Sequence, residues 1–172
     1  RLKFGKIYLY KVTKNGDKWS NSKALPFNNQ AYSVRNPALS ADGKTLYFSS
    51  DMPGGMGGED IYKVSVDGDT YGTPENLGSK VNTEGDESFP FVTDKGVLYF
   101  ASNAREGFGG FDIFKIDLAN DAEPTNIGEP VNTEKDDFSF AFNTAKKVAF
   151  FSSNRAGVDN IYMATPICGV NG

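Results

Sequence analysis

The sequence has no histidine among its 172 residues and a single cysteine, Cys168. Without histidine the chain has neither a Ser-His-Asp nor a Cys-His arrangement to activate a nucleophile, and no histidine-based metal site. Any catalysis would rest on carboxylates, tyrosine, lysine or arginine. One cysteine forms no disulfide framework within these residues, so we expect Cys168 to be a buried thiol, with pairing to a cysteine elsewhere as the alternative.

Long apolar runs and clustered basic residues are also missing. Apolar residues make up 38% of the chain, enough for a substantial core, but no run approaches the length of a membrane helix. We therefore expect no membrane span in this segment. Lysine and arginine are scattered along the sequence and the net charge is −4, which argues against a nucleic-acid partner.

What the sequence does contain is an internal repeat. The string NPALSADGKTLYFSSD begins a unit that returns as SFPFVTDKGVLYFASN and again as SFAFNTAKKVAFFSSN. Asp60 and Asp112 are 52 residues apart, and Asp112 and Asn160 are 48 apart. A period near fifty in which every run is typical of a strand predicts the blades of a β-propeller.

Each repeat divides into short strands. The runs TLYFSS, VLYFAS and VAFFSS are rich in β-branched and aromatic residues, and turn signals follow them. They are apolar at consecutive positions, so both faces of each strand should be buried. In the second repeat the sequence predicts strands at 88–92, 97–102, 112–117 and 124–127. The predicted fold class is therefore all-β, a β-propeller of four-stranded antiparallel blades.

The predicted strands amount to about three and a half blades, whereas closed propellers have about four to eight. Residues 1–33 hold the last strands of a preceding blade and a connection, 34–86 and 87–136 are whole blades, 137–164 a partial blade, and 165–172 a linker to a following domain. An open array would leave strand edges and an apolar blade face exposed. We therefore expect these residues to be part of a longer chain.

The repeat resembles a known propeller family. Pro37 to Ser49 and Asp60 to Val64 match the TolB-type propeller repeat, a relative of WD repeats. The Gly-rich insertion before Asp-Ile-Tyr, and NLGSKVNT after it, resemble the variant in OmpA-family envelope proteins of Bacteroidetes. The third repeat departs from the pattern, because its loop is shortened to NRAGVDN and Ala141 stands in the place of Pro90.

This resemblance implies a domain order, a location and partners. In that group the propeller lies between tetratricopeptide repeats and an OmpA-like C-terminal domain, often with a regulatory-like β-domain between them, and ATPICGVNG resembles the junction into that β-domain. The resemblance implies a periplasmic, outer-membrane-associated, non-catalytic scaffold or protein-binding module. Its partners would be envelope or secretion-complex proteins, in some members the type IX secretion system. Peptidoglycan would be bound only through a domain outside these residues, and no cofactor is implied.

Two matched acidic loops would suit a paired-carboxylate glycosidase. Their residues are Glu84, Asp86, Glu87, Glu134, Asp136 and Asp137. A repeated acidic loop is usually a solvated surface, and SADGKTLYF does not meet the Asp-box pattern of sialidase propellers. We therefore expect no enzyme; the alternative is a propeller enzyme acting on glycans, or the propeller domain of a peptidase.

The Gly-rich stretch PGGMGGED lies between two predicted strands, so no helix N-terminus is there to bind a phosphate. We expect its glycines to allow positive φ angles in a tight loop. Asp60, Asp112 and Asn160 are expected to brace such loops by accepting hydrogen bonds from backbone amides. The alternative is Ca²⁺ binding by Asp51, Glu59 and Asp60, whereas the bracing hypothesis involves no metal.

Loop length distinguishes two faces of the predicted propeller. The loops between second and third strands, and those that join blades, are long and emerge on one face, whereas ADGKT and TDKG on the other face are tight turns. Because loops on rigid scaffolds carry function, the long-loop face is the predicted binding surface. Its candidate partner-binding residues are Met52, Met56, Arg105, Phe108 and Arg155, with Asn82, Glu84, Asn132 and Glu134 near the channel mouth. The simpler interpretation is that they only solvate and brace the loops.

Aromatic pairs in the strands are predicted to form the blade core and not a ligand site. They are Tyr47, Phe48, Tyr99, Phe100, Phe150 and Phe151.

Overall fold

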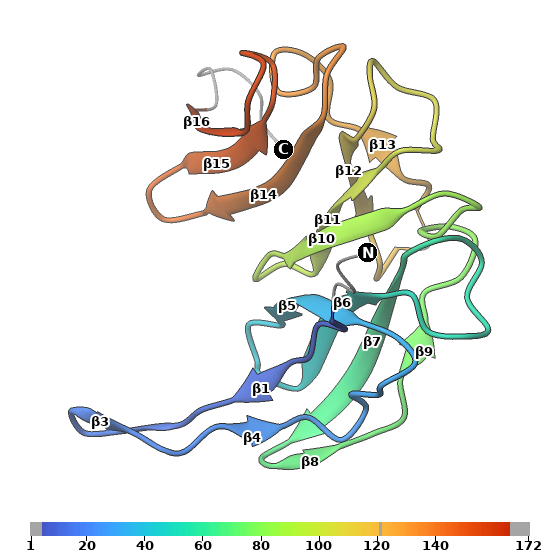
Figure 1. The fold of residues 1–172 in the computed structure, drawn as a ribbon. Coiled ribbons are helices and arrows are strands. Elements are labelled where there is room, and N and C mark those ends of the chain that lie inside the picture. Colours follow the sequence, from blue (N-terminus) through green and yellow to red (C-terminus); the bar gives the residue numbers. More distant parts are fainter. Residues whose placement is uncertain (1–4, 121, 166–172) are drawn as a thin grey trace.

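The computed structural model describes residues 5–120 and 122–165. The regular secondary structure of these residues consists of β-strands alone. The strands pair into antiparallel sheets (Figure 1). The described residues contain no helix that could cross a membrane. The predicted all-β fold class is therefore confirmed.

Two sheets contain a full set of strands, and we call them the first and second blades. The first blade consists of β5 (Val34–Leu39), β6 (Thr45–Ser50), β7 (Asp60–Asp67) and β9 (Glu75–Asn76), with β8 (Thr70–Tyr71) paired to the end of β7. The second blade consists of β10 (Glu87–Val92), β11 (Val97–Ser102), β12 (Asp112–Asp117) and β13 (Thr125–Asn126). In both blades the strands follow one another in space as they do along the chain, and the last strand is short.

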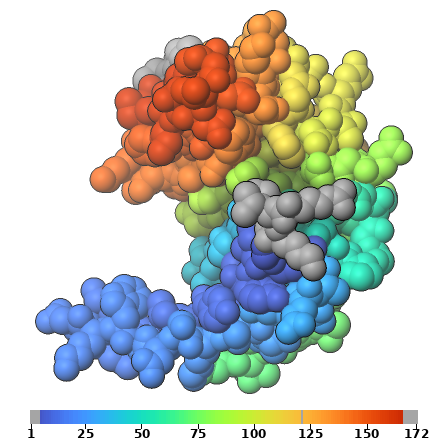
Figure 2. Space-filling view, viewed as in Figure 1, coloured from blue at the N-terminus to red at the C-terminus, as the bar shows by residue number. Residues whose placement is uncertain are grey.

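The remaining strands lie at the two ends of the chain. The third blade contains β14 (Asp137–Asn143), β15 (Val148–Ser153) and β16 (Asn160–Ala164). Near the N-terminus, β1 (Tyr10–Lys11) pairs with β4 (Lys23–Ala24), and between them β2 (Lys14–Asn15) and β3 (Lys18–Trp19) form a hairpin. This hairpin projects from the body of the molecule at the lower left of Figure 2.

The blades follow one another around a common axis. Strand β10 contacts β5 and β6 on one side and β14 on the other, so the first strands of successive blades are neighbours (Figure 1). We therefore call β5, β10 and β14 the innermost strands. Stacked antiparallel sheets of this kind form a β-propeller, of which this chain provides about three and a half blades.

Apolar residues are buried between neighbouring sheets. Phe27, from the segment after β4, stacks on Phe48 of the first blade with ring centroids 4.9 Å apart. Ile61 of the first blade is fully buried in a second cluster with Leu98, Phe100 and other residues of the second blade. The core therefore lies in the junctions between sheets, which is why both faces of these strands are apolar.

One predicted core residue lies at the surface. Phe48, Phe100 and Phe151 are at most 4% exposed, but Phe150 is 47% exposed and the prediction for it is wrong. Phe150 is the register partner of Met163, which is also exposed. Both belong to a side of the third blade that the described residues leave uncovered. The tyrosines at the position equivalent to Phe150 in the other two blades are half-buried.

The innermost strand of every blade carries a bulge at the same place. Asn36, Phe89 and Ser139 have φ angles of 53°, 54° and 55°, although none of them is glycine. At each bulge, two residues of the innermost strand oppose one residue of the next strand. This register also corrects the alignment of the third repeat, because Phe140 takes the place of Pro90.

Candidate functional site

The long-loop face is built by the loops that join the second and third strands of each blade. In the first blade this loop folds around Asp60, which is 1% exposed. The Asp60 carboxylate accepts hydrogen bonds from the backbone amides of Met56 and Gly57 and, at 2.9 Å, from the side-chain amide of Asn76. The aspartate thus ties its own loop to the short outer strand of the blade.

The second blade repeats this arrangement around Asp112. Its carboxylate accepts hydrogen bonds from the amides of Phe108 at 2.5 Å and Gly109 at 3.4 Å. Burial raises the pKa of Asp112, while these two amides act in the opposite direction. The loop amides therefore offset part of the cost of burying the carboxylate charge.

Glycines in these loops make room for the next blade. A Cβ atom on Gly57 would lie 2.3 Å from the carbonyl oxygen of Gly85, and one on Gly109 would lie 2.4 Å from that of Lys135. Both oxygens belong to the connection into the following blade. Among the glycines of these two loops, only Gly54 has the positive φ angle that we expected. The Gly-rich pattern therefore reflects close packing between blades more than loop conformation.

The loop tips present apolar side chains to solvent. Met56 and Phe108 lie at equivalent positions, four residues before the buried aspartate, and are 46% and 48% exposed. The shorter loop of the third blade presents Val158, which is 66% exposed. The backbone amides of Met56 and Phe108 donate hydrogen bonds to the buried aspartates, so the side chains of Met56 and Phe108 project from an ordered backbone. An exposed apolar group on an ordered loop suits contact with another protein.

The two arginines predicted to bind a partner are engaged inside the chain. Arg105 donates to the carbonyl oxygens of Lys80 at 2.7 Å and Val81 at 3.0 Å. Arg155 makes the equivalent bonds to the connection that leads into the third blade. Both guanidinium groups also lie over aromatic rings of their own blade. In this structure the arginines hold the connections between blades.

The structure contradicts a surface role for Asn82 and Asn132, which are 1% and 0% exposed. The side-chain amide of Asn82 accepts from the Ile61 amide at 2.8 Å and donates to the Ile61 carbonyl at 2.9 Å. Asn132 makes the same pair of bonds with Ile113. Each asparagine therefore braces the third strand of the preceding sheet and is not free to contact a partner.

Two further candidates differ from expectation. Asn160 is exposed, and its side-chain amide donates to the carbonyl of Val158 at 3.1 Å, so it does not gather loop amides as Asp60 and Asp112 do. The shortened third loop accounts for this difference. Met52 is half-buried and packs against the core of the first blade.

The acidic residues considered for catalysis do not assemble a paired-carboxylate site. Glu87 and Asp137 are fully buried, and each accepts bonds from the backbone amide and hydroxyl of a threonine four residues earlier. Asp137 also pairs with Arg155 at 2.7 Å. Glu84 and Glu134 are exposed. Asp86 and Asp136 accept hydrogen bonds from the side-chain amides of Asn103 and Asn154, which directly follow the second strands of their blades.

The three carboxylates considered for Ca²⁺ have separate partners. Asp51 pairs with Lys6 at 2.8 Å, Glu59 lies 3.5 Å from Arg35, and Asp60 binds its own loop. Burial raises the pKa of Glu59, an effect that Arg35 opposes. Within residues 5–120 and 122–165, no three potential metal ligands gather at one place.

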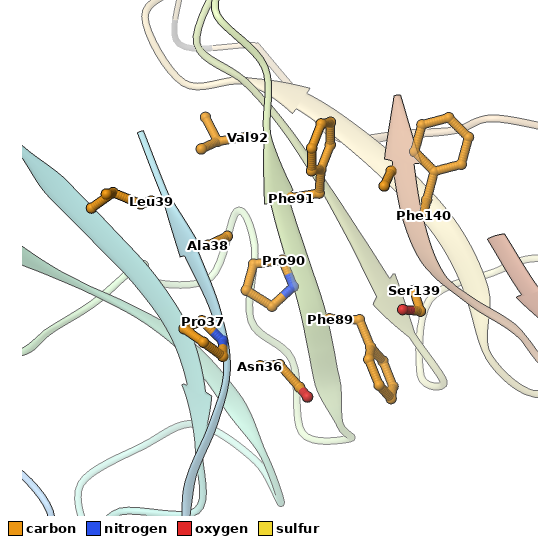
Figure 3. A pocket seen from close by; sticks show the side chains of 11 residues that line it. Asn36, Pro37, Ala38, Leu39, Phe89, Pro90, Phe91, Val92, Ser139 and Phe140 are labelled. Carbon is orange, nitrogen blue, oxygen red and sulfur yellow. The ribbon is translucent and has the colours of Figure 1, made fainter. Parts of the chain in front are cut away.

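A cavity of about 340 Å³ lies where the innermost strands of the three blades meet (Figure 3). Its wall consists of the bulges and their neighbours, and Figure 3 shows Pro37 and Pro90 beside the space between β5 and β10. Asn36 and Ser139 are the polar residues among the eleven that line it, and none of the eleven is titratable. The cavity therefore suits an uncharged group and offers no acid or base.

Sequence reasoning missed this cavity because its shape depends on backbone bulges. The available signal was a proline inside an otherwise strand-like run, at Pro37 and Pro90, since proline within a strand often accompanies a bulge. The third blade lacks that signal, because Phe140 occupies the position.

No protein-family model and no curated protein sequence matches the chain. Solved structures do match it. A protein assigned as TolB from Agrobacterium tumefaciens has a TM-score of 0.59 and 17% identity, over 95% of this chain and 55% of its own. For TolB from Acinetobacter baumannii the TM-score is 0.56 and the identity 13%, over 91% of this chain and 40% of that one. For a puromycin-hydrolyzing peptidase from Mycobacterium tuberculosis the TM-score is 0.54 and the identity 15%, over 91% of this chain and 22% of that one.

At these identities the likeness shows the fold alone, which is that of a TolB-type propeller. The chain spans little more than half the length of the first of these proteins and less of the others. They include both TolB proteins and a peptidase. Because one fold carries several functions, the function must be argued from the surface of this chain.

Proposed function

We propose that the chain is a protein-binding propeller module of the cell envelope that acts through its long-loop face. The observation that carries this proposal is the exposure of Met56, Phe108 and Val158 on loops of three successive blades. Methionine and aromatic side chains are enriched in protein interfaces. A side chain on a backbone that is already ordered also loses less conformational freedom on binding.

The envelope setting and the finer role rest on sequence resemblance and on the TolB neighbours. We propose a periplasmic, outer-membrane-associated location, because the repeats resemble those of Bacteroidetes OmpA-family proteins and because TolB proteins share the fold. The partners would be envelope or secretion-complex proteins, the type IX secretion system among them. The module would link such a complex to the cell wall, with peptidoglycan held by a different domain.

We propose no catalytic function. The peptidase neighbour supports only the shared fold. Among the carboxylates considered for glycan cleavage, Glu87 and Asp137 are fully buried and bonded within the scaffold. A binding role requires only the exposed loop tips, which the structure provides.

Site-specific cross-linking tests the proposed function. A photoreactive amino acid would replace Met56 or Phe108 in cells that naturally produce the protein, and, as controls, Lys44 or Lys95 on the short turns. We expect one cross-linked partner from both loop positions and none from the controls. The double variant Met56→Ser and Phe108→Ser should abolish the complex without changing thermal melting. The proposal fails if cross-links form only at the short turns, or if the double variant keeps its partner.

A further inference from the structure

A glutamate lies beside the exposed apolar tip of the loop in the first blade. Gly57 follows Met56, and its backbone packs closely on the next connection, so that a Cβ atom on Gly57 would lie 2.7 Å from the carbonyl carbon of Glu84. The amide of Gly58 donates to the carbonyl of Gly85 at 2.8 Å, which holds this contact in place. Glu84 is exposed, so an apolar group and an acidic group share this part of the long-loop face.

The other two blades repeat this pairing of an apolar tip with an acidic residue. A Cβ atom on Gly109, the residue after Phe108, would lie 2.5 Å from the carbonyl carbon of Glu134, which is exposed. In the third blade the exposed Val158 is followed directly by the exposed Asp159. An acidic residue therefore accompanies the apolar tip in each of the three blades.

The basic groups of the same face are engaged within the chain. Arg105 and Arg155 donate to carbonyl groups of the connections between blades. Lys80 lies 3.8 Å from the carboxylate of Glu123, and Lys135 lies 3.9 Å from that of the glutamate before it. The cations are therefore already paired where the loop tips are exposed.

Three acidic residues of this face have no basic partner among the described residues. They are Glu84, Glu106 and Asp159, all of which are exposed. Glu106 lies two residues before Phe108 in the same loop. The long-loop face therefore presents apolar tips with a border of net negative charge.

The charge of this border discriminates between the surfaces that apolar tips could contact. Nucleic acids and anionic lipid headgroups carry negative charge and would be repelled at close range, whereas a basic protein surface would be attracted. Met56 and Phe108 also require apolar groups opposite them, because a partner that left them in water would gain nothing from their exposure.

We propose that the partner of the long-loop face is a protein surface on which lysine or arginine residues surround apolar side chains. This inference rests on the proposed function and adds the chemistry of the partner. The apolar groups of the partner cover Met56 and Phe108 and supply most of the affinity. Its basic groups lie opposite Glu84 and Glu134, where they favour the correct partner and speed association.

Binding of three labelled peptides to the whole chain tests this inference. The first is a fluorescein-labelled amphipathic peptide of leucine and lysine. In the second peptide glutamate replaces every lysine, and in the third serine replaces every leucine. We expect a saturable rise in fluorescence anisotropy with the first peptide and none with the other two. Raising the salt concentration from about 0.05 M to about 0.5 M should weaken binding of the first peptide, because salt screens exposed charges.

Two matched double variants locate the charges that matter. Glu84→Gln with Glu134→Gln removes two charges beside the loop tips, and we expect it to weaken binding of the leucine-lysine peptide about fivefold. Asp67→Asn with Asp94→Asn removes the same charge from exposed turns on the opposite face and should leave binding unchanged. All four positions are at the surface, so neither double variant should change thermal melting.

Three results would overturn the inference. The first is failure of the leucine-lysine peptide to bind, or equally tight binding of the leucine-glutamate peptide. The second is equal affinity of the two double variants for the leucine-lysine peptide. The third is binding of the chain to anionic phosphatidylglycerol vesicles in a flotation assay, which would assign the loop tips to a membrane surface.

Cross-linking in cells separates this inference from the proposed function. With the photoreactive amino acid at Phe108, we expect the yield of cross-linked partner to fall when Glu84→Gln and Glu134→Gln are added. The paired changes on the opposite face should leave that yield unchanged. An unchanged yield in both cases overturns the inference about charge and leaves the proposed function standing. Absence of any cross-link from Met56 or Phe108 in the otherwise unaltered chain overturns both.

Discussion

Buried polar side chains recur at equivalent positions in successive blades. They form hydrogen bonds with backbone groups that would otherwise have no partner. Asp60 and Asp112 gather the amides of their own loops, while Asn82 and Asn132 bracket the third strands. Removing such a side chain leaves buried donors or acceptors unpaired, and that costs more than the net worth of the hydrogen bond. These residues are therefore expected to control stability and not partner binding.

Replacing Asp112 by alanine tests this role. Asp112→Ala would leave the amides of Phe108 and Gly109 without their acceptor, and we expect a loss of about 1 to 3 kcal/mol in the free energy of unfolding. Chemical denaturation measures it. Asp159→Ala, at an exposed aspartate of the third loop, is the control and should change stability by less than about 0.5 kcal/mol. Equal stability of the two variants would contradict the bracing role.

The Arg155–Asp137 pair gives a second prediction for single residues. Asp137 is fully buried and lies 2.7 Å from the guanidinium, so Arg155→Met would leave a buried carboxylate without its cation. We expect a loss of about 3 to 5 kcal/mol, measured by chemical denaturation. Adding Asp137→Asn should restore part of that loss, because the unpaired charge disappears. A double variant less stable than Arg155→Met would show that the charge is not the cause.

Between elements, the two junctions that join the blades differ in chemistry. The junction of the first and second blades contains a polar group in which Glu59 lies 3.5 Å from Arg35 and accepts from the Ser88 hydroxyl at 3.2 Å. The junction of the second and third blades is aromatic, with Tyr99 stacked on Phe140 at 4.6 Å. Because Glu59 is titratable, the strength of the polar junction should depend on pH.

Glu59→Gln tests that dependence. Burial raises the pKa of Glu59 above its ordinary value of 4.5, so the folded protein keeps this proton at a pH where the unfolded chain has lost it. The contribution of Glu59 to stability is thus fully present below pH 4.5 and is lost as the pH rises through the raised pKa. We expect Glu59→Gln to raise the melting temperature at pH 7 and to leave it nearly unchanged at pH 4. A lower melting temperature at pH 7 would mean that the pair with Arg35 outweighs burial.

The strands could be predicted from local features of the sequence, whereas features that depend on packing between distant residues could not. The strand runs and the period depend on residue types within a few positions, which is why β11 was predicted at the residues where it occurs. The bulges at Asn36, Phe89 and Ser139 were not predicted, because none of these residues is glycine. The burial of Asn82 depends on Ile61, which lies 21 residues away, and no local pattern records that contact.

At the scale of the whole molecule, the blades form an arc, and the described residues leave the outer face of the third blade uncovered. Ile61 and Ile113 are fully buried, but Ile161, at the same position of the third blade, is 78% exposed, and Met163 beside it is 65% exposed. In Figure 2 the molecule is hollowed between the third blade and the projecting hairpin. The equivalent isoleucine is therefore buried in the first two blades and exposed in the third, so the repeat provides an internal comparison.

Replacing each of these isoleucines by lysine measures how much the junctions contribute to the free energy of unfolding. Ile61→Lys and Ile113→Lys would each place an ammonium group in a dry junction, and we expect losses above about 3 kcal/mol, enough to unfold a marginally stable domain. Ile161→Lys should change the free energy of unfolding by less than about 0.5 kcal/mol, because that side chain is already in water. Chemical denaturation of the three variants, with sedimentation to exclude association, gives the comparison. Equal losses at all three positions would mean that the third face is covered in solution, whereas a loss confined to Ile61 and Ile113 places the stability of the arc in its two closed junctions.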